Sequence, residues 1–205
     1  IKGGADFYLN EKNTLTLSGE YGFWGFNLEM DANNFEYTDP VSSDIYKNSI
    51  SILDIGGNWI NGSVIFDHDF KKDHDLVTTF TYSTWDGTNS TDVDERDTDD
   101  QWMNPITLFH YKSNRNDVNN DIRFKTDYTQ PIGNKSKIEA GLQVRYFTLN
   151  SLYSLDNMDL ETNDWVEDPE FRNDMDFLRI INSAYATFSS NFKGIQYQIG
   201  LRGEY

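Results

Sequence analysis

Apolar and polar residues alternate with a period of two along several stretches of the chain. In the clearest stretch, residues 137–149, one set of positions is mainly apolar and the other mainly polar: Ile138, Ala140, Leu142, Val144 and Tyr146 against Glu139, Gly141, Gln143 and Arg145. Successive side chains of an extended strand point to opposite faces, so this spacing predicts a β-strand with one apolar face. No stretch combines helical spacing with the end signals of a helix.

The same alternation predicts eight strands. We expect them near residues 1–8, 14–23, 57–69, 76–85, 121–128, 137–149, 180–191 and 195–205. Short connections rich in turn-forming residues lie at 10–13, 70–75, 132–136 and 192–194, and long connections lie at about 27–55, 86–116 and 150–179. Alternating short and long connections are typical of an up-and-down barrel. The predicted fold is therefore all-β: an antiparallel, up-and-down transmembrane β-barrel segment over residues 1–205, with short turns at one end and long acidic loops at the other.

The negative charge is concentrated in the long connections. They hold 22 acidic and 6 basic residues, which accounts for −16 of the formal net charge of −17. The remaining residues are nearly balanced. The charge pattern therefore predicts a neutral β framework that carries three acidic loops.

Composition excludes several classes of protein. The strong negative charge argues against a nucleic-acid partner, because phosphate binding needs a basic surface. The absence of cysteine excludes disulfide scaffolds and thiolate metal sites. The mean hydropathy of −0.68, with no apolar run near 18 residues, excludes a transmembrane helix. Membrane barrels need only about ten alternating residues per strand and stay compatible with this composition.

Two features favour a membrane barrel over a soluble β-sandwich. Charged side chains occupy the middle of the polar strand faces, as a wet lumen allows. We expect the following residues to face the lumen: Arg123, Lys125, Gln143, Arg145, Gln198 and Arg202. Aromatic residues also lie near the predicted strand ends, as in the girdles at membrane interfaces: Phe7, Tyr8, Tyr21, Phe23, Trp24, Trp59, Tyr82, Trp85, Tyr128, Tyr146 and Phe147. A soluble β-sandwich that binds a glycan or another ligand stays open as the alternative.

Three segments resemble the barrels of Bacteroidetes-type TonB-dependent outer-membrane receptors. Residues 5–21, A-D-F-Y-L-N-E-K-N-T-L-T-L-S-G-E-Y, are similar to a strand–turn–strand unit of that family. Residues 62–76, G-S-V-I-F-D-H-D-F-K-K-D-H-D-L, resemble a further hairpin, and residues 197–205, Y-Q-I-G-L-R-G-E-Y, resemble a common strand of these barrels. The shared motifs are strand and turn patterns rather than catalytic sequences.

The resemblance implies a location in the cell outer membrane and a function in ligand import. It implies a barrel of about 22 strands with an N-terminal plug, of which these residues supply a part of the barrel and no plug. The implied partners are outer-membrane lipid, the TonB complex through other parts of the parent protein, and an imported ligand that the sequence does not identify.

Calcium is the one cofactor that the sequence suggests. Acidic residues at short spacing offer the hard oxygen ligands that Ca²⁺ prefers: Asp92, Asp94, Asp97, Asp99 and Asp100. The central glycine and terminal glutamate of an EF-hand loop are absent. An acidic loop tip in contact with water explains the same residues without any metal.

Aromatic residues in the long connections are candidate ligand contacts. Trp102, Tyr111 and Trp165 lie among acids and amides, a mixture that suits a sugar or a cationic ligand. Packing of the loops against one another is the alternative explanation. The chain contains no nucleophile elbow, phosphate-binding glycine loop or zincin motif, so we expect no enzymatic activity and rank a hydrolytic β-protein last.

Overall fold

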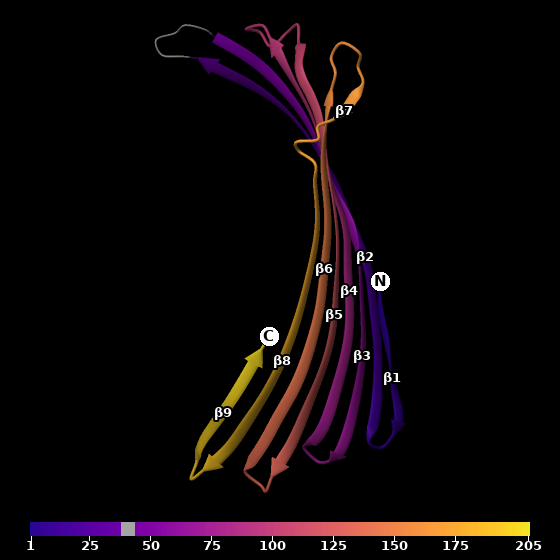
Figure 1. Ribbon diagram of the computed structural model, residues 1–205, viewed down its shortest axis with the longest axis vertical. Coiled ribbons are helices and arrows are strands. Elements are labelled where there is room, and N and C mark those ends of the chain that lie inside the picture. Colours follow the sequence, from indigo (N-terminus) through magenta and orange to yellow (C-terminus); the bar gives the residue numbers. More distant parts are fainter. Residues whose placement is uncertain (38–43) are drawn as a thin grey trace.

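The computed structural model describes residues 1–37 and 44–205, which form a single antiparallel sheet (Figure 1). Its strands are β1 (Lys2–Asn10), β2 (Asn13–Tyr37), β3 (Asp44–Lys71), β4 (His74–Thr98), β5 (Ile106–Ile132), β6 (Ser136–Met158), β7 (Trp165–Glu167), β8 (Asn173–Phe192) and β9 (Ile195–Glu204). Neighbours in the sheet follow the order β1-β2-β3-β4-β5-β6-β8-β9, and the three-residue β7 pairs with the end of β6. The predicted all-β, antiparallel, up-and-down arrangement is confirmed, with β7 as an additional ninth strand.

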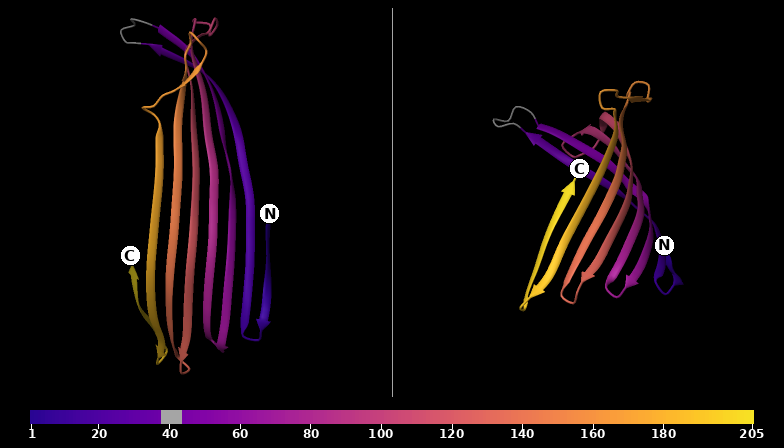
Figure 2. Two further views of the ribbon diagram at one scale, coloured as in Figure 1. Left: turned by 45° about the vertical axis from the view of Figure 1, so that its right-hand side comes forward. Right: turned by 60° about the horizontal axis from the view of Figure 1, so that its bottom comes forward.

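The four short turns lie where the sequence predicts them. They connect β1 to β2, β3 to β4, β5 to β6 and β8 to β9, and all lie at one end of the sheet (Figures 1 and 2). The turn between β8 and β9 consists of Lys193 and Gly194, both with positive φ. Positive φ at both positions suits a two-residue hairpin turn, whose twist matches that of the flanking strands. We refer to this end of the sheet as the turn end and to the opposite end as the loop end.

The long connections are much shorter than the sequence suggests, and this part of the prediction is wrong. Most of 27–55, 86–116 and 150–179 extends the strands, so that β3 has 28 residues and β5 has 27. The connections that remain at the loop end among the described residues are 99–105 and the segment 159–172 around β7. Residues 38–43 of the predicted connection 27–55 lie outside the described residues. A transmembrane strand needs about 9–11 residues. The longest strands therefore extend far beyond one membrane thickness.

The sheet is a single layer. None of the hydrophobic residues that the structure describes is buried, and Leu142 is 58% exposed. A soluble β-sandwich hides its apolar strand faces between two packed sheets, so this exposure contradicts the sandwich alternative. None of the described residues forms a helix that is long and apolar enough to cross a membrane.

The pairing register divides the side chains between two faces of the sheet. One face, the Leu142 face, carries Leu17, Val64, Phe80, Phe124 and Val144, which are paired in this order from β2 to β6, and Leu142, two residues from Val144 on β6. The other, the Gln143 face, carries their sequence neighbours Ser18, Ser63, Thr81, Arg123 and Gln143. β1 and β9 form the two edges of the sheet, and no described pairing joins them.

Candidate functional site

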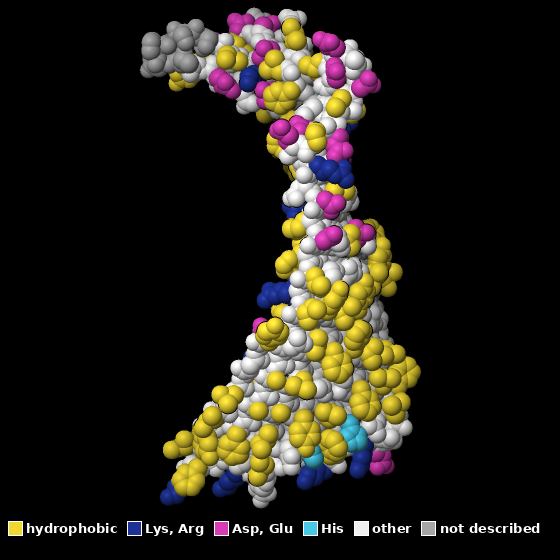
Figure 3. All heavy atoms as spheres, viewed as in Figure 1, with side chains coloured by type: hydrophobic (Ala, Val, Ile, Leu, Met, Phe, Trp, Pro, Cys, Tyr) yellow, Lys and Arg dark blue, Asp and Glu magenta, His cyan; other side chains and the backbone are white. Residues whose placement is uncertain are grey.

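The Leu142 face is apolar over the half of the sheet nearest the turns. Figure 3 shows hydrophobic side chains gathered over this half, whereas most visible acidic side chains lie toward the loop end. On β3 the apolar band runs from Ile60 to His68, and on β6 it runs from Ile138 to Tyr146. Bands of this length match the roughly 9–11 residues that a strand needs to cross a bilayer.

Aromatic side chains mark both borders of this apolar band. Tyr21, Phe23, Tyr82 and Tyr146 lie on the border toward the loop end. At the turn end, the ring of Phe70 stacks on His74 with centroids 4.5 Å apart, and His74 Nε2 lies 2.8 Å from the Tyr128 hydroxyl. Rings with a polar tip suit the boundary between hydrocarbon and water.

Toward the loop end the Leu142 face becomes polar. Carboxylates on this face accept hydrogen bonds from amides on the adjacent strand: Asn27 Nδ2 donates to Asp54 Oδ1 at 2.8 Å and Asn48 Nδ2 donates to Asp31 Oδ1 at 2.5 Å. Asn150 donates similarly to Asp176. The acidic residues that the sequence assigns to long loops thus lie on extended strands, on a part of the Leu142 face that is polar.

The six residues with a predicted lumen orientation all lie on the Gln143 face. Arg145 Nη2 contacts Asp121 Oδ2 at 2.5 Å, and Arg123 Nη2 lies 3.7 Å from the same carboxylate oxygen. Lys125 pairs with Asp127 at 2.6 Å and Arg202 with Glu204 at 3.1 Å. Gln143 is the cross-strand partner of Lys125, and Gln198 lines a hollow near the turns. In the turn-end half, this face therefore carries a network of paired charges.

The Gln143 face becomes aromatic toward the loop end, at the level where the Leu142 face becomes polar. The rings of Trp24 and Trp85 have centroids 6.0 Å apart and planes 22° apart, and those of Trp59 and Trp85 are 6.4 Å and 26° apart. Phe26 extends the row, with its ring 6.0 Å from that of Trp24 at 15°. We call these four side chains, Trp24, Phe26, Trp59 and Trp85, the aromatic platform.

Three glycines make room for the platform rings. An added Cβ atom at Gly22 would lie 2.0 Å from Cζ2 of Trp59. Added Cβ atoms at Gly57 and Gly87 would lie 2.6 Å and 2.5 Å from atoms of the Trp85 indole. The two indoles therefore lie against bare backbone, which leaves their other surfaces toward the space above the Gln143 face.

The platform corrects the interpretation of Trp24, Trp59 and Trp85 as girdle residues. All three point away from the Leu142 face, where the apolar band lies. Their position on the Gln143 face follows from counting by two along each strand, from Ser18 to Trp24, from Ser63 to Trp59 and from Thr81 to Trp85, so this signal is present in the sequence. Only the register between strands brings them together.

Polar groups flank the platform on the same face. Asn119 is the cross-strand partner of Trp85, and Asp117 is the partner of Gly87. The Asp117 carboxylate accepts hydrogen bonds from the Ser151 hydroxyl at 2.5 Å and from Arg115 Nε at 3.1 Å. On the turn side, the Ser83 hydroxyl donates to Asn61 Oδ1 at 2.7 Å.

The five candidate calcium ligands are not brought together. Asp92 and Asp94 lie within β4, where Asp92 Oδ1 is 2.5 Å from His110 Nε2 and Asp94 pairs with Arg96. Asp97 lies near the end of β4, and Asp99 and Asp100 lie in the following turn. Within the described part of the chain, no group of three or more histidine or acidic side chains is arranged to hold a metal ion.

Asp99 organises the connection between β4 and β5. Its carboxylate accepts hydrogen bonds from the backbone N–H of Met103 at 2.7 Å, from that of Gln101 at 3.0 Å and from Asn104 Nδ2 at 2.8 Å. The bond from Met103, followed by those from Asn104 and Gln101, lowers the pKa of Asp99 against a smaller opposing effect of burial. The oxygens of the Asp99 carboxylate therefore stabilise this turn by accepting hydrogen bonds from it.

The three predicted ligand aromatics lie apart from one another. Trp102 packs edge-on against Tyr46 with centroids 5.3 Å apart. Tyr111 lies on the Gln143 face of β5, beyond the aromatic platform. Trp165, in β7, covers the Leu142 face, where the Lys112 ammonium lies 4.0 Å from its ring centroid.

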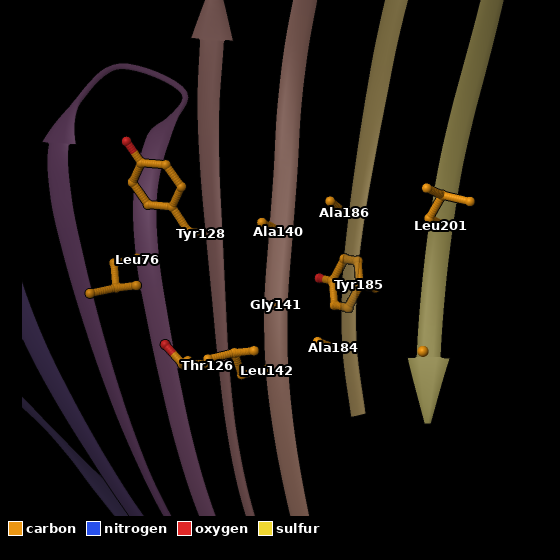
Figure 4. Close-up of a pocket in the computed structure, with 11 residues that line it drawn as sticks. Leu76, Thr126, Tyr128, Ala140, Gly141, Leu142, Ala184, Tyr185, Ala186 and Leu201 are labelled. Atoms are coloured by element: carbon orange, nitrogen blue, oxygen red, sulfur yellow. The ribbon is translucent and has the colours of Figure 1, made fainter. Parts of the chain in front are cut away.

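Two hollows lie near the turn end, on opposite faces. The larger, about 1350 Å³, opens on the Gln143 face and is lined by polar residues that include Lys137, Glu139 and Gln198. The smaller, about 470 Å³, is an apolar groove on the Leu142 face (Figure 4). It forms where Ala140, Ala184 and Ala186 stand between larger side chains on neighbouring strands.

Comparison with known proteins agrees with this architecture. No curated protein matches the chain. Residues 68–205 match the outer membrane protein beta-barrel family, and this region covers the strands from the end of β3 to β9. The match to most of the chain, on a single up-and-down sheet with an exposed apolar band, identifies the chain as a member of the outer membrane protein beta-barrel family, located in the outer membrane.

Proposed function

We propose that this chain forms part of the barrel of a TonB-dependent receptor, which binds a ligand at the loop end and imports it across the outer membrane. The observation that carries the proposal is the exchange of polarity between the two faces. Near the turns, the Leu142 face is apolar and the Gln143 face is charged. Toward the loop end, the Leu142 face carries carboxylates and the Gln143 face carries the aromatic platform.

The exchange has a simple physical basis in this proposal. The Leu142 face meets lipid near the turns and water beyond the membrane, while the Gln143 face lines the barrel interior throughout. A vestibule above the membrane with an apolar, aromatic inner wall can bind a ligand before transport, as binding sites generally combine apolar surface with a few polar groups. The resemblance of residues 5–21 and 197–205 to TonB-dependent receptors supports active import over passive diffusion.

The proposal includes further strands beside β1 and β9. Backbone N–H and C=O groups along a sheet edge are costly to leave unpaired within a bilayer, which is why membrane sheets close into barrels. We expect strands of the parent protein to pair with both edges and to enclose a plug. The proposed partners are thus outer-membrane lipid, the TonB complex and the imported ligand, and the proposed function is transport rather than catalysis.

Conductance and uptake measurements test this function. The full-length protein in planar bilayers should show no steady conductance, because a plug fills the lumen of such a receptor. Ligand uptake by cells that express it should stop when TonB is deleted or when the proton gradient is collapsed. A large, constant conductance together with TonB-independent uptake would identify a passive pore instead.

A further inference from the structure

The aromatic platform combines exposed rings, Trp24 and Phe26, with the half-buried indoles of Trp59 and Trp85. Trp24 is 44% exposed, although it lies between Phe26 and Trp85 in the row. Gly22 and Gly57 leave the space that the indoles of Trp59 and Trp85 occupy against the backbone. Placing the indoles of Trp59 and Trp85 over glycines buries one side of each against the backbone, and both indoles stay partly exposed. Nothing in the described residues covers that second side with another sheet or helix.

The geometry of the rings favours a ligand with extended flat faces. Ring planes differ by 15–26° and centroids lie 6.0–6.4 Å apart, so neighbouring rings are offset and roughly parallel. Such a row offers several stacking positions in sequence. A chain of cyclic units, each with a CH-rich face, would contact successive rings.

The charges around the platform favour a neutral ligand. On the Gln143 face, Asp117 is paired with Arg115 at 2.9 Å and Glu95 with Lys47 at 3.1 Å. The acidic side chains that hydrogen-bond to amides at Asp54 and Asp31 point to the other face. Apart from Glu20, which lies opposite Asn61 and forms no ion pair within the described residues, a cationic ligand would find few free carboxylates beside the rings.

The flanking amides and hydroxyls argue against a purely apolar ligand. Asn119 lies directly beside Trp85, and Ser83 with Asn61 lies one step toward the turns. Burying these groups under hydrocarbon would leave hydrogen-bonding capacity unsatisfied, which costs free energy. A ligand that offers both CH faces and hydroxyl groups satisfies the rings and the amides together.

We infer that the aromatic platform binds a neutral oligosaccharide, with sugar rings stacked on Trp24 and Trp85 and hydroxyls hydrogen-bonded along the Asn119 and Asp117 side. The inference rests on the proposed import function, of which it names the substrate class. The ligand enters from the loop end and lies along the row of rings.

Calorimetry with the full-length protein tests the inference. The protein is held in amine-oxide micelles, which carry no sugar headgroup, and is titrated with maltohexaose, cellohexaose and mannohexaose. Oleate and tetrabutylammonium serve as apolar and cationic probes. We expect at least one hexasaccharide to bind, and Trp24→Ala to weaken its binding about tenfold, as loss of a stacking contact predicts. Trp24→Phe should weaken it less, and Trp165→Ala, on the other face, should leave it unchanged.

Three results would overturn the inference: no hexasaccharide binds, binding does not depend on Trp24, or oleate or tetrabutylammonium binds in its place through Trp24. Circular dichroism of each variant confirms that the sheet is intact. Because binding is measured without TonB, the result is independent of transport. Saccharide binding without TonB-dependent uptake would leave the site assignment standing and reject the import function.

Discussion

The indole of Trp59 lies directly over the backbone of Gly22 on the neighbouring strand. The two residues are cross-strand partners, and an added Cβ atom at Gly22 would fall 2.0 Å from Cζ2 of the indole. No side chain larger than hydrogen fits this position without moving the ring or the strand. Glycine generally weakens a β-strand. At position 22 it is nevertheless required, because only glycine leaves room for the indole of Trp59.

Gly22→Ala should destabilise the sheet and displace Trp59. We expect the free energy of unfolding to fall by about 1–3 kcal/mol, as for other forced overpacking. The measurement is a urea titration of the full-length protein in lipid vesicles, followed by tryptophan fluorescence. Gly19→Ala is the matched control, because the nearest atom to an added Cβ there is 3.8 Å away. Equal stability of the two variants would contradict the role assigned to Gly22.

Leu142→Arg should reduce the free energy of folding into a membrane far more than Gln143→Arg, although the two positions are adjacent. Leu142 lies in the middle of the apolar band, and Gln143 lies on the face with paired charges. A lipid-facing arginine near the membrane midplane costs about 2–4 kcal/mol, and one on the interior face much less. Folding titrations of both variants into vesicles provide the comparison. Equal penalties would exclude lipid contact by the Leu142 face.

The turn closed by Asp99 should loosen in acid. Because hydrogen bonds lower the pKa of Asp99 in the folded state, its ionised form stabilises the turn at pH values above the pKa of the unfolded chain. This stabilisation is lost as the pH falls through the lowered pKa. The measurement is the protection factor of the Gln101 and Met103 amides between pH 7 and pH 3, that is, their exchange rate relative to the rate of an unfolded chain at the same pH. We expect the protection factors to fall in acid.

Two variants serve as controls for this pH dependence. Asp99→Asn keeps an Oδ1 atom that can accept the bonds from Gln101 and Met103 but cannot ionise, so it should remove most of the change in protection with pH. Asp100→Asn should behave like the unmodified protein, since Asp100 accepts none of the hydrogen bonds that close the turn. A pH response that persists in Asp99→Asn would assign it to another group.

The sequence predicts the turn-end half of the sheet well, because a single phase of alternation holds there. On β2, Leu15, Leu17 and Tyr21 keep to one face, and the pattern predicts the strand that is observed. At Phe23 and Trp24 two aromatic residues stand side by side. Beyond them, the apolar positions continue in the opposite phase, through Phe26 and Leu28. The strand continues, but beyond Phe23 its apolar side chains lie on the Gln143 face instead of the Leu142 face. A prediction that requires a single apolar face therefore ends β2 too early.

The loop-end half of β5 gives no strand signal in the sequence, for a different reason. Residues 114–120, N-R-N-D-V-N-N, consist mainly of types that are depleted in strands. Tertiary pairing overrides that preference, since β5 is paired on both sides here with β4 and β6. The same limit applies to the site: the positions of Trp24, Trp59 and Trp85 on the Gln143 face follow from their own strands, but their proximity depends on a register that single strands do not reveal.

The loop end should face the outside of the cell and the turn end the periplasm. Antiparallel strands place alternate connections at opposite ends, and outer-membrane barrels keep short turns on the periplasmic side. Because Asp92 and Asp94 lie within β4, the accessible segment on the outer side is 99–105 rather than the acidic cluster as a whole.

Cleavage by an added protease tests this orientation in intact cells. A recognition site for a specific protease is inserted after Asn104 in one variant and between Lys72 and Asp73, in the turn between β3 and β4, in another. Insertions at such exposed connections leave the paired backbone of the strands unchanged. We expect cleavage of the first variant in intact cells, and cleavage of the second only after the outer membrane is permeabilised. The reverse pattern would invert the topology, and would place the aromatic platform on the periplasmic side, where it could not receive a ligand from outside.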